Sequence, residues 1–176
     1  MVSLRGEDNV AKGYSHQVIT AISFGLTTAV ITSFGMIVGM HSATSSRLAV
    51  VAGIVIMAFA DGLSDAVSLH TAEEAEVEEE ESKHTAKEIW LTTLLAFISV
   101  SGFTLTFAIP ILFLPSYSAI VVAIVWGMLL LILLNLYIAK IRKENPMKLL
   151  LEHIFLAVVV IVISYFVGNL TAVAFG

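Results

Sequence analysis

The chain has 176 residues, of which 58% are hydrophobic and 13% charged, and its mean hydropathy is +0.95. These values lie outside the usual range of soluble domains, so they predict an all-α integral membrane protein without a sizeable soluble domain. The formal net charge of −5 disfavours nucleic acid as a partner, and the absence of cysteine excludes disulfides and thiolate metal sites.

Five apolar stretches are each long enough for the roughly 20 residues that cross a ~30 Å hydrocarbon core. The polar segment 1–17 has no short apolar core with a small-residue cleavage site, so we expect a cytoplasmic N-terminal segment rather than a signal peptide. Residues 18–176 then form one five-helix transmembrane domain. The expected spans are residues 18–40, 48–69, 89–114, 117–139 and 154–175.

The distribution of lysine and arginine predicts the orientation in the membrane. These residues gather before the first span and in the second and fourth connections, whereas Arg47 alone lies in the first and third connections. The positive-inside bias therefore predicts a cytoplasmic N-terminus and a C-terminus on the opposite side of the lipid bilayer.

The first span carries small and soft side chains. Gly35 and Gly39 form a G-x-x-x-G pair, which lets a second helix approach closely and is a weak indication of a dimer contact. Thr28 offers a hydroxyl on the same helical stripe. Met36 and Met40 are candidate thioether ligands, although methionine in an apolar helix more often serves packing.

The second span contains two carboxylates. Asp61 and Asp65 are four residues apart, so on a helix they lie on one face about one turn apart, on a stripe that Met57 and Ser68 continue. An aspartate near the bilayer centre costs roughly 2.5–3.5 kcal/mol, and two like charges repel further, which favours a role in binding a cation. The alternative is that both side chains reach water near the cytoplasmic end of the span and merely end the helix.

An acidic run follows, and we expect it to continue the second helix into the cytoplasm. Such carboxylates suit divalent cations and would raise their concentration near the membrane, although a solvated acidic linker would have the same composition. His84 adds a possible ligand, whereas His70 is expected to lie off the aspartate stripe. The candidate cation-collecting residues in the connection 71–87 are Glu73, Glu74, Glu76, Glu78, Glu80 and Glu81, in a run that also holds Glu79.

Prolines mark the later connections. Pro110 and Pro115 predict a tight apolar turn that joins the third and fourth spans as a hairpin. Pro146 suits the first turn of the last helix.

The order of these segments resembles the vacuolar iron transporter family. The resemblance is carried by SFGLTTAVITSFGMIVG, ADGLSDAVSLHTAEE, AKEIWLTTLLAFISVSGFTLTFAIPILF and SYFVGNL, in the first, second, third and last spans. It implies a five-span homodimer that exports Fe²⁺ or Mn²⁺ in exchange for protons, with the first spans lining a path between the subunits. Neither a cofactor nor enzymatic activity is implied.

The resemblance also assigns roles to single residues. Asp61 matches the acidic residue of the family's second span, while Ser68 and Leu69 match the serine and methionine that follow, so that thioether ligand is lost. Thr28 stands where the family carries an aspartate, and Asp65 where it usually has a small residue. We infer that the second pore carboxylate has moved from the first span to the second. The acidic connection is far shorter than the family's metal-binding domain, so only the glutamate-rich first portion of that domain is expected.

Two other function classes stay open. The letters DGLSD are similar to the opening of the CDP-alcohol phosphotransferase motif, but the rest of that motif is missing, and an intramembrane aspartyl protease would need its aspartates on facing helices. The other class is a membrane organiser whose acidic run recruits a basic protein. A flux measurement separates this possibility from a transporter.

Overall fold

The computed structural model describes the backbone of residues 2–79 and 86–176 and the side chains of residues 17–75 and 86–176. The regular structure of these residues is entirely helical, and five of the helical segments are long and apolar enough to cross a membrane. The all-α fold and the multi-pass membrane class are therefore confirmed. The helices are α1 (Val2–Thr44), α2 (Arg47–Glu79), α3 (Ala86–Thr106), α4 (Ala108–Phe113), α5 (Ser116–Arg142) and α6 (Pro146–Phe175).

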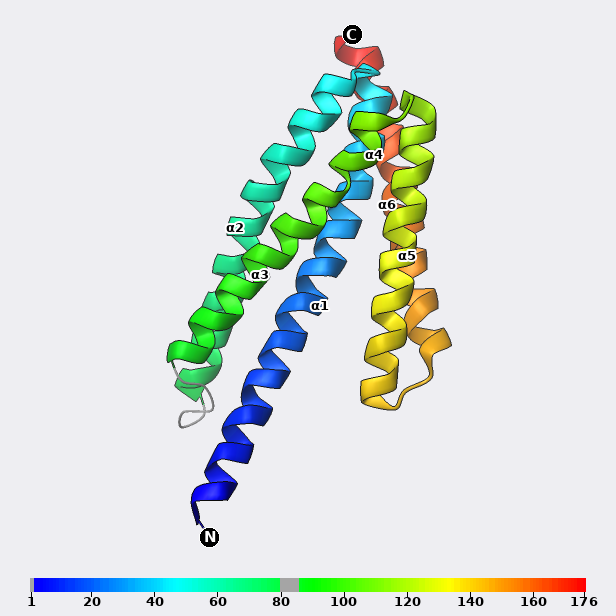
Figure 1. Ribbon diagram of the computed structural model, residues 1–176. Coiled ribbons are helices and arrows are strands. Elements are labelled where there is room, and N and C mark those ends of the chain that lie inside the picture. Colours follow the sequence, from blue (N-terminus) through cyan, green and yellow to red (C-terminus); the bar gives the residue numbers. More distant parts are fainter. Residues whose placement is uncertain (1, 80–85) are drawn as a thin grey trace.

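Helix α1 lies at the centre of the bundle. Figure 1 shows α2 and α3 on one side of it and α5 and α6 on the other, and the two pairs diverge toward the end where the chain begins. We call this the N-terminal end of the bundle. The opposite, C-terminal end carries the turn from α1 to α2, the short helix α4 and the C-terminus.

The helices extend further than the apolar stretches predict. Helix α1 begins at Val2, so the polar residues 2–17 continue as a helix directly into the first span. Helix α2 runs through the acidic residues to Glu79, as predicted, and α3 begins at Ala86. The connection 71–87 is therefore mostly an extension of α2.

The prediction for Pro110 is wrong, because this residue lies inside a helix. The chain breaks earlier, at Phe107, whose N–H donates to the carbonyl of Thr104 at 3.1 Å, and α4 then carries Pro110 in its first turn. A proline there has no N–H to donate, so the preceding turn is the natural place for the interruption. Only Leu114 and Pro115 remain between α4 and α5.

The connection between α5 and α6 has a defined cap at each end, and Pro146 lies where it was predicted. Lys143 ends α5 in the left-handed conformation with φ of 56°. Asn145 caps α6 by accepting a hydrogen bond from the N–H of Met147 at 2.9 Å, and Pro146 occupies the first turn. These features fix where α6 starts.

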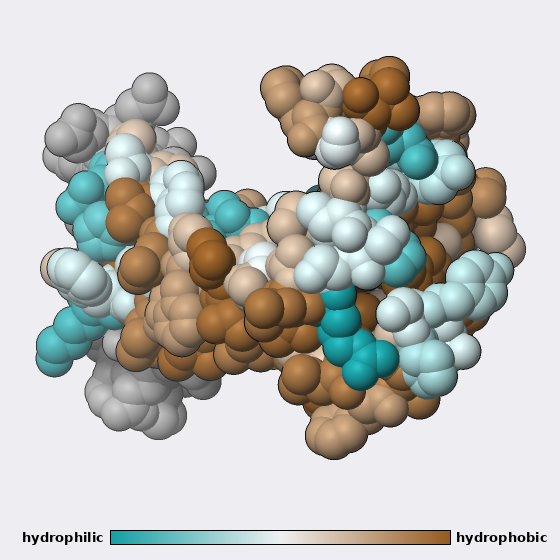
Figure 2. Space-filling model, turned by 90° about the horizontal axis from the view of Figure 1, so that it is seen from above, coloured by the Kyte–Doolittle hydropathy of each residue, from teal (hydrophilic) through white to brown (hydrophobic). Residues whose placement is uncertain are grey.

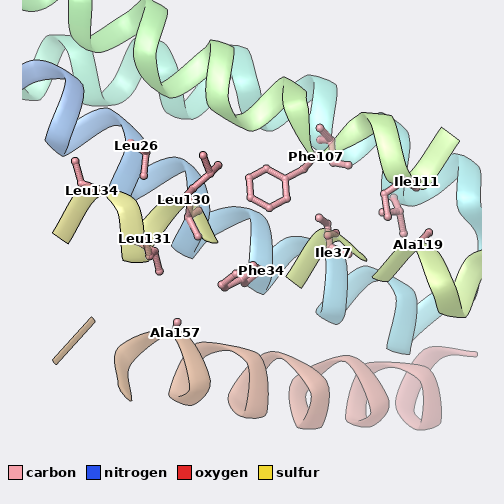
Figure 3. Close-up of a cluster of buried hydrophobic side chains, with 14 residues drawn as sticks. Leu26, Phe34, Ile37, Phe107, Ile111, Ala119, Leu130, Leu131, Leu134 and Ala157 are labelled. Carbon is pink, nitrogen blue, oxygen red and sulfur yellow. The ribbon is translucent and has the colours of Figure 1, made fainter. Parts of the chain in front are cut away.

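The apolar core lies where α1, α4 and α5 approach one another (Figure 3). Phe34 of α1 and Phe107 meet edge to face, with their ring centres 6.1 Å apart. Gly127 of α5 provides the space, because a β-carbon there would lie only 2.5 Å from the Phe34 ring. This contact holds α5 against α1 near mid-span.

Apolar side chains also cover much of the outer surface. Seen from the C-terminal end, the molecule has two parts joined by a narrower waist, and brown apolar residues follow much of its outline (Figure 2). On α6 only Ala157 and Gly168 are buried. Such a surface is suited to hydrocarbon rather than to water.

Candidate cation site

The candidate carboxylates are positioned by a close contact between α2 and α3. Gly62 lies against Ser101 and Phe97, and a β-carbon at position 62 would lie within 3.2 Å of the Phe97 ring. The Ser101 hydroxyl donates to the carbonyl of Ala58 at 2.7 Å. The α2 backbone on both sides of Asp61 is therefore fixed against α3.

The exposure of successive residues defines three sides of α2. The side toward α3 is buried and contains Ala58, Gly62 and Ala66, whereas the side with Phe59, Leu63 and Val67 is exposed. The half-buried side between them contains Gly53, Met57, Asp61 and Asp65.

Near Gly53, the half-buried side of α2 faces α1. A β-carbon at Gly53 would lie 2.7 Å from the sulfur of Met36 on α1. Gly53 precedes Asp61 by about two turns, and the contact with Met36 lies there rather than at the aspartates. Asp61 and Asp65 are both half-buried, as the predicted shared face requires, while Ser68, at the end of the stripe, is exposed.

Asp65 has a buried carboxylate oxygen. Its Oδ2 atom is buried and has no hydrogen-bond partner among the described residues. A carboxylate oxygen removed from water without a donor is costly, so this atom is suited to accept a proton or a cation.

The contacts that the described residues show for the α1 candidates do not involve the aspartates. Thr28 and Thr32 are half-buried, and the Thr32 hydroxyl donates to the Thr28 carbonyl at 2.9 Å. Met36 contacts Gly53, which is roughly 12 Å along α2 from Asp61. The described contacts thus separate the thioether from the carboxylates.

Gly35 and Gly39 of α1 contact α6 of the same chain. A groove of about 340 Å³ between α1 and α6 is lined in part by Gly35, Met36, Gly39 and Met40. Gly168 of α6 packs directly on the Gly39 backbone and leaves no room for a β-carbon. These small residues therefore bring α6 against α1, and the two methionines line the groove beside that contact.

His70 lies on the α3 side of α2, off the aspartate stripe, as expected. Its Nδ1 lies 2.8 Å from the Thr93 hydroxyl, its ring centre 4.8 Å from that of Trp90, and its Nε2 3.3 Å from Glu74. Glu73 is half-buried, and its Oε2 has no hydrogen-bond partner in the described part of the chain. Glu74 is therefore linked to the contact between α2 and α3 through His70.

The rest of the acidic run lies partly in α2 and partly outside the described residues. Glu76, Glu78 and Glu79 lie in α2, which supports the predicted helical continuation. The predicted ligands Glu80, Glu81 and His84 lie outside the described residues.

The buried polar residues of α3 were not predicted from the sequence. Glu88 is only 7% exposed, and Thr92 and Thr104 are fully buried. Ser99 lies against Gly25 of α1, where a β-carbon would come within 3.0 Å of the α3 backbone. The signal was the recurrence of acid and hydroxyl residues at helical spacing within an apolar span.

Asp61 and Asp65 are the candidate metal ligands that lie together among the described side chains. Within residues 17–75 and 86–176, no group of three or more histidine, aspartate or glutamate side chains is arranged to hold a metal ion. Asp61 and Asp65 would provide part of an oxygen-ligand shell, which for hard divalent ions has about six members. Comparison with models of protein families, with curated proteins and with solved structures finds no match to this chain.

Proposed function

We propose that the protein transports a divalent transition metal, Fe²⁺ or Mn²⁺, out of the cytoplasm in exchange for protons. The observation that carries the proposal is the pair of carboxylates, Asp61 and Asp65, half-buried and one turn apart inside a membrane-spanning helix. Acidic residues at such depth are expensive and mark ion pathways. The resemblance to vacuolar iron transporters supports the same class.

The coupling to protons follows from the repulsion between the two carboxylates. With both side chains charged, their mutual repulsion and the buried Oδ2 of Asp65 disfavour the empty site. Binding of either a proton or a divalent cation removes this repulsion. A metal ion arriving from the cytoplasm displaces the proton, and a proton from the opposite side releases the metal.

A homodimer would complete the ligand shell. A single chain offers two clustered carboxylates, so a second copy doubles them, and hydroxyls, backbone carbonyls or water provide the remaining oxygens. Mass photometry in mild detergent should give the mass of a dimer; a population of monomers alone would contradict this arrangement.

The acidic extension of α2 would act as a cytoplasmic cation collector. It begins on the same helix as the aspartates, so cations attracted to it are concentrated at the entrance of the site. This function does not require a defined metal-binding geometry.

The test of the proposal is metal and proton flux in proteoliposomes that contain a pH-sensitive dye. Asp61→Asn and Asp65→Asn should fold yet abolish metal flux or uncouple it from proton movement. Glu152→Gln, which removes an exposed carboxylate of α6, is the matched control and should behave as wild type. Wild-type flux in both aspartate variants would show that the pair only ends the apolar part of the helix. A folded wild type without flux would favour the membrane organiser.

A further inference from the structure

A second groove lies between α1 and α5, away from the aspartates. Its volume is about 330 Å³. The isoleucines among its lining residues form an apolar wall, and the threonine, serine and arginine add hydroxyl and guanidinium groups. The lining residues are Ile19, Thr20, Ser23, Ile138, Ile141 and Arg142.

The position of the groove corresponds to the boundary of the hydrocarbon. Ile19 and Thr20 follow the polar segment 1–17 closely, and Arg142 is the last residue of α5, so the polar side of the groove lies where lipid headgroups would meet the chain. Figure 1 shows that α1 and α5 are separated at this N-terminal end of the bundle. The groove therefore opens toward one leaflet.

The charge at the groove is positive. Residues 140–148 contain four basic side chains, Lys140, Arg142, Lys143 and Lys148, against the single acid Glu144. The Nε of Arg142 lies 3.7 Å from Glu144, and the two side chains are 60% and 55% exposed. An exposed pair at this distance is weak, so the guanidinium retains donors for another anion.

We propose that the groove binds an anionic phospholipid of the adjacent leaflet. Its phosphate accepts hydrogen bonds from Arg142 and from the hydroxyls of Thr20 and Ser23, and the first part of one acyl chain packs on the isoleucines. Basic pockets between membrane helices bind anionic headgroups in this way. Ligand pockets span roughly 300–1,000 Å³, so this groove suits a headgroup and the start of a chain rather than a whole lipid.

The test uses the purified full-length chain in detergent with phosphatidylglycerol and phosphatidylcholine as probes. Native mass spectrometry measures the bound fraction of each. Wild type should retain phosphatidylglycerol in preference, and Arg142→Gln should weaken its binding about fivefold. Lys148→Gln removes the same charge from the first turn of α6, outside the groove lining, and should have little effect.

A third variant tests the apolar part of the groove. Ser23→Leu keeps every charge but fills the groove and removes a hydroxyl, so it should also weaken binding of phosphatidylglycerol. Thermal unfolding in detergent verifies that each variant is folded. Equal retention of the two lipids by wild type, or equal losses in Arg142→Gln and Lys148→Gln, would overturn the proposal in favour of general surface attraction.

Discussion

Gly62 of α2 packs against Ser101 of α3 so closely that the position has no room for a β-carbon, and the same serine donates its hydroxyl to the carbonyl of Ala58. One contact thus fixes the α2 backbone on the N-terminal side of Asp61 and immediately after it. The positions of Asp61 and Asp65 therefore depend on the contact between Gly62 and Ser101.

Replacing Gly62 by alanine should therefore destabilise the protein. The new methyl group meets the Ser101 hydroxyl and the Phe97 ring, and overpacking of this kind costs about 1–3 kcal/mol in the free energy of unfolding. Gly102→Ala is the matched control, because no atom lies within 4 Å of a β-carbon there. Thermal unfolding in detergent should give a lower Tm for Gly62→Ala and an equal or higher Tm for Gly102→Ala. Equal Tm values in all three proteins would contradict the close contact.

Asp65→Asn should stabilise the metal-free protein. It removes the charge from a half-buried side chain whose Oδ2 has no described partner, a gain of about 1–3 kcal/mol. Mn²⁺ at 100 times its Kd should stabilise wild type by about 2.7 kcal/mol, by mass action on the folded state. The variant should lose this increment. A Mn²⁺-dependent rise in Tm of the same size in both proteins would place the metal elsewhere.

The acidic extension should affect apparent affinity but not maximal rate. Replacing its seven glutamates, from Glu73 to Glu81, by glutamine removes the attraction that concentrates cations near the membrane. The apparent KM for metal should rise at low ionic strength, and the difference should disappear near 1 M salt, where the Debye length is about 3 Å. Flux measured across a salt series tests this, and a complete loss of flux would mean that the run takes part in the transport step.

His70→Ala should loosen the α2–α3 contact near the acidic extension. The change removes the hydrogen bond to Thr93 and the ring contact with Trp90, at a cost of about 0.5–1.5 kcal/mol. In a Trp126→Phe background Trp90 is the remaining tryptophan, so its emission reports the contact directly. The emission should shift in His70→Ala and stay unchanged in His41→Ala, at the other end of the bundle; an unchanged spectrum in both would argue against the ring contact.

The sequence predicted the membrane spans well because crossing a hydrocarbon core requires a long apolar run. The ends of helices were predicted less well. Helices α1 and α2 continue into polar residues, where backbone hydrogen bonding persists after hydropathy has fallen. The break at Phe107 was missed because Pro110 indicates that a helix is interrupted nearby but does not fix the residue.

The candidate site was predicted in part. Four-residue spacing is enough to place Asp61 and Asp65 on one side of a helix, but it does not say which neighbour that side approaches. Gly35 and Gly39 illustrate the same difficulty: their spacing predicts a close helix contact, and the structure shows α6 of the same chain as a partner. The burial of the α3 hydroxyls could not be predicted, because it depends on how α1 and α2 pack around α3.

The few buried positions of α6 have a consequence for how the protein is made. This helix contacts α1 through small residues such as Gly168 and Ala157, and most of its other side chains are apolar and partly or fully exposed. In a bilayer the same side chains are already solvated by lipid, so docking on α1 adds little apolar burial and depends on the fit of two backbones. Helix α6 is thus stable in the membrane before it docks on α1. During synthesis its insertion and its docking are separate events, and harsh extraction should reverse the second without the first.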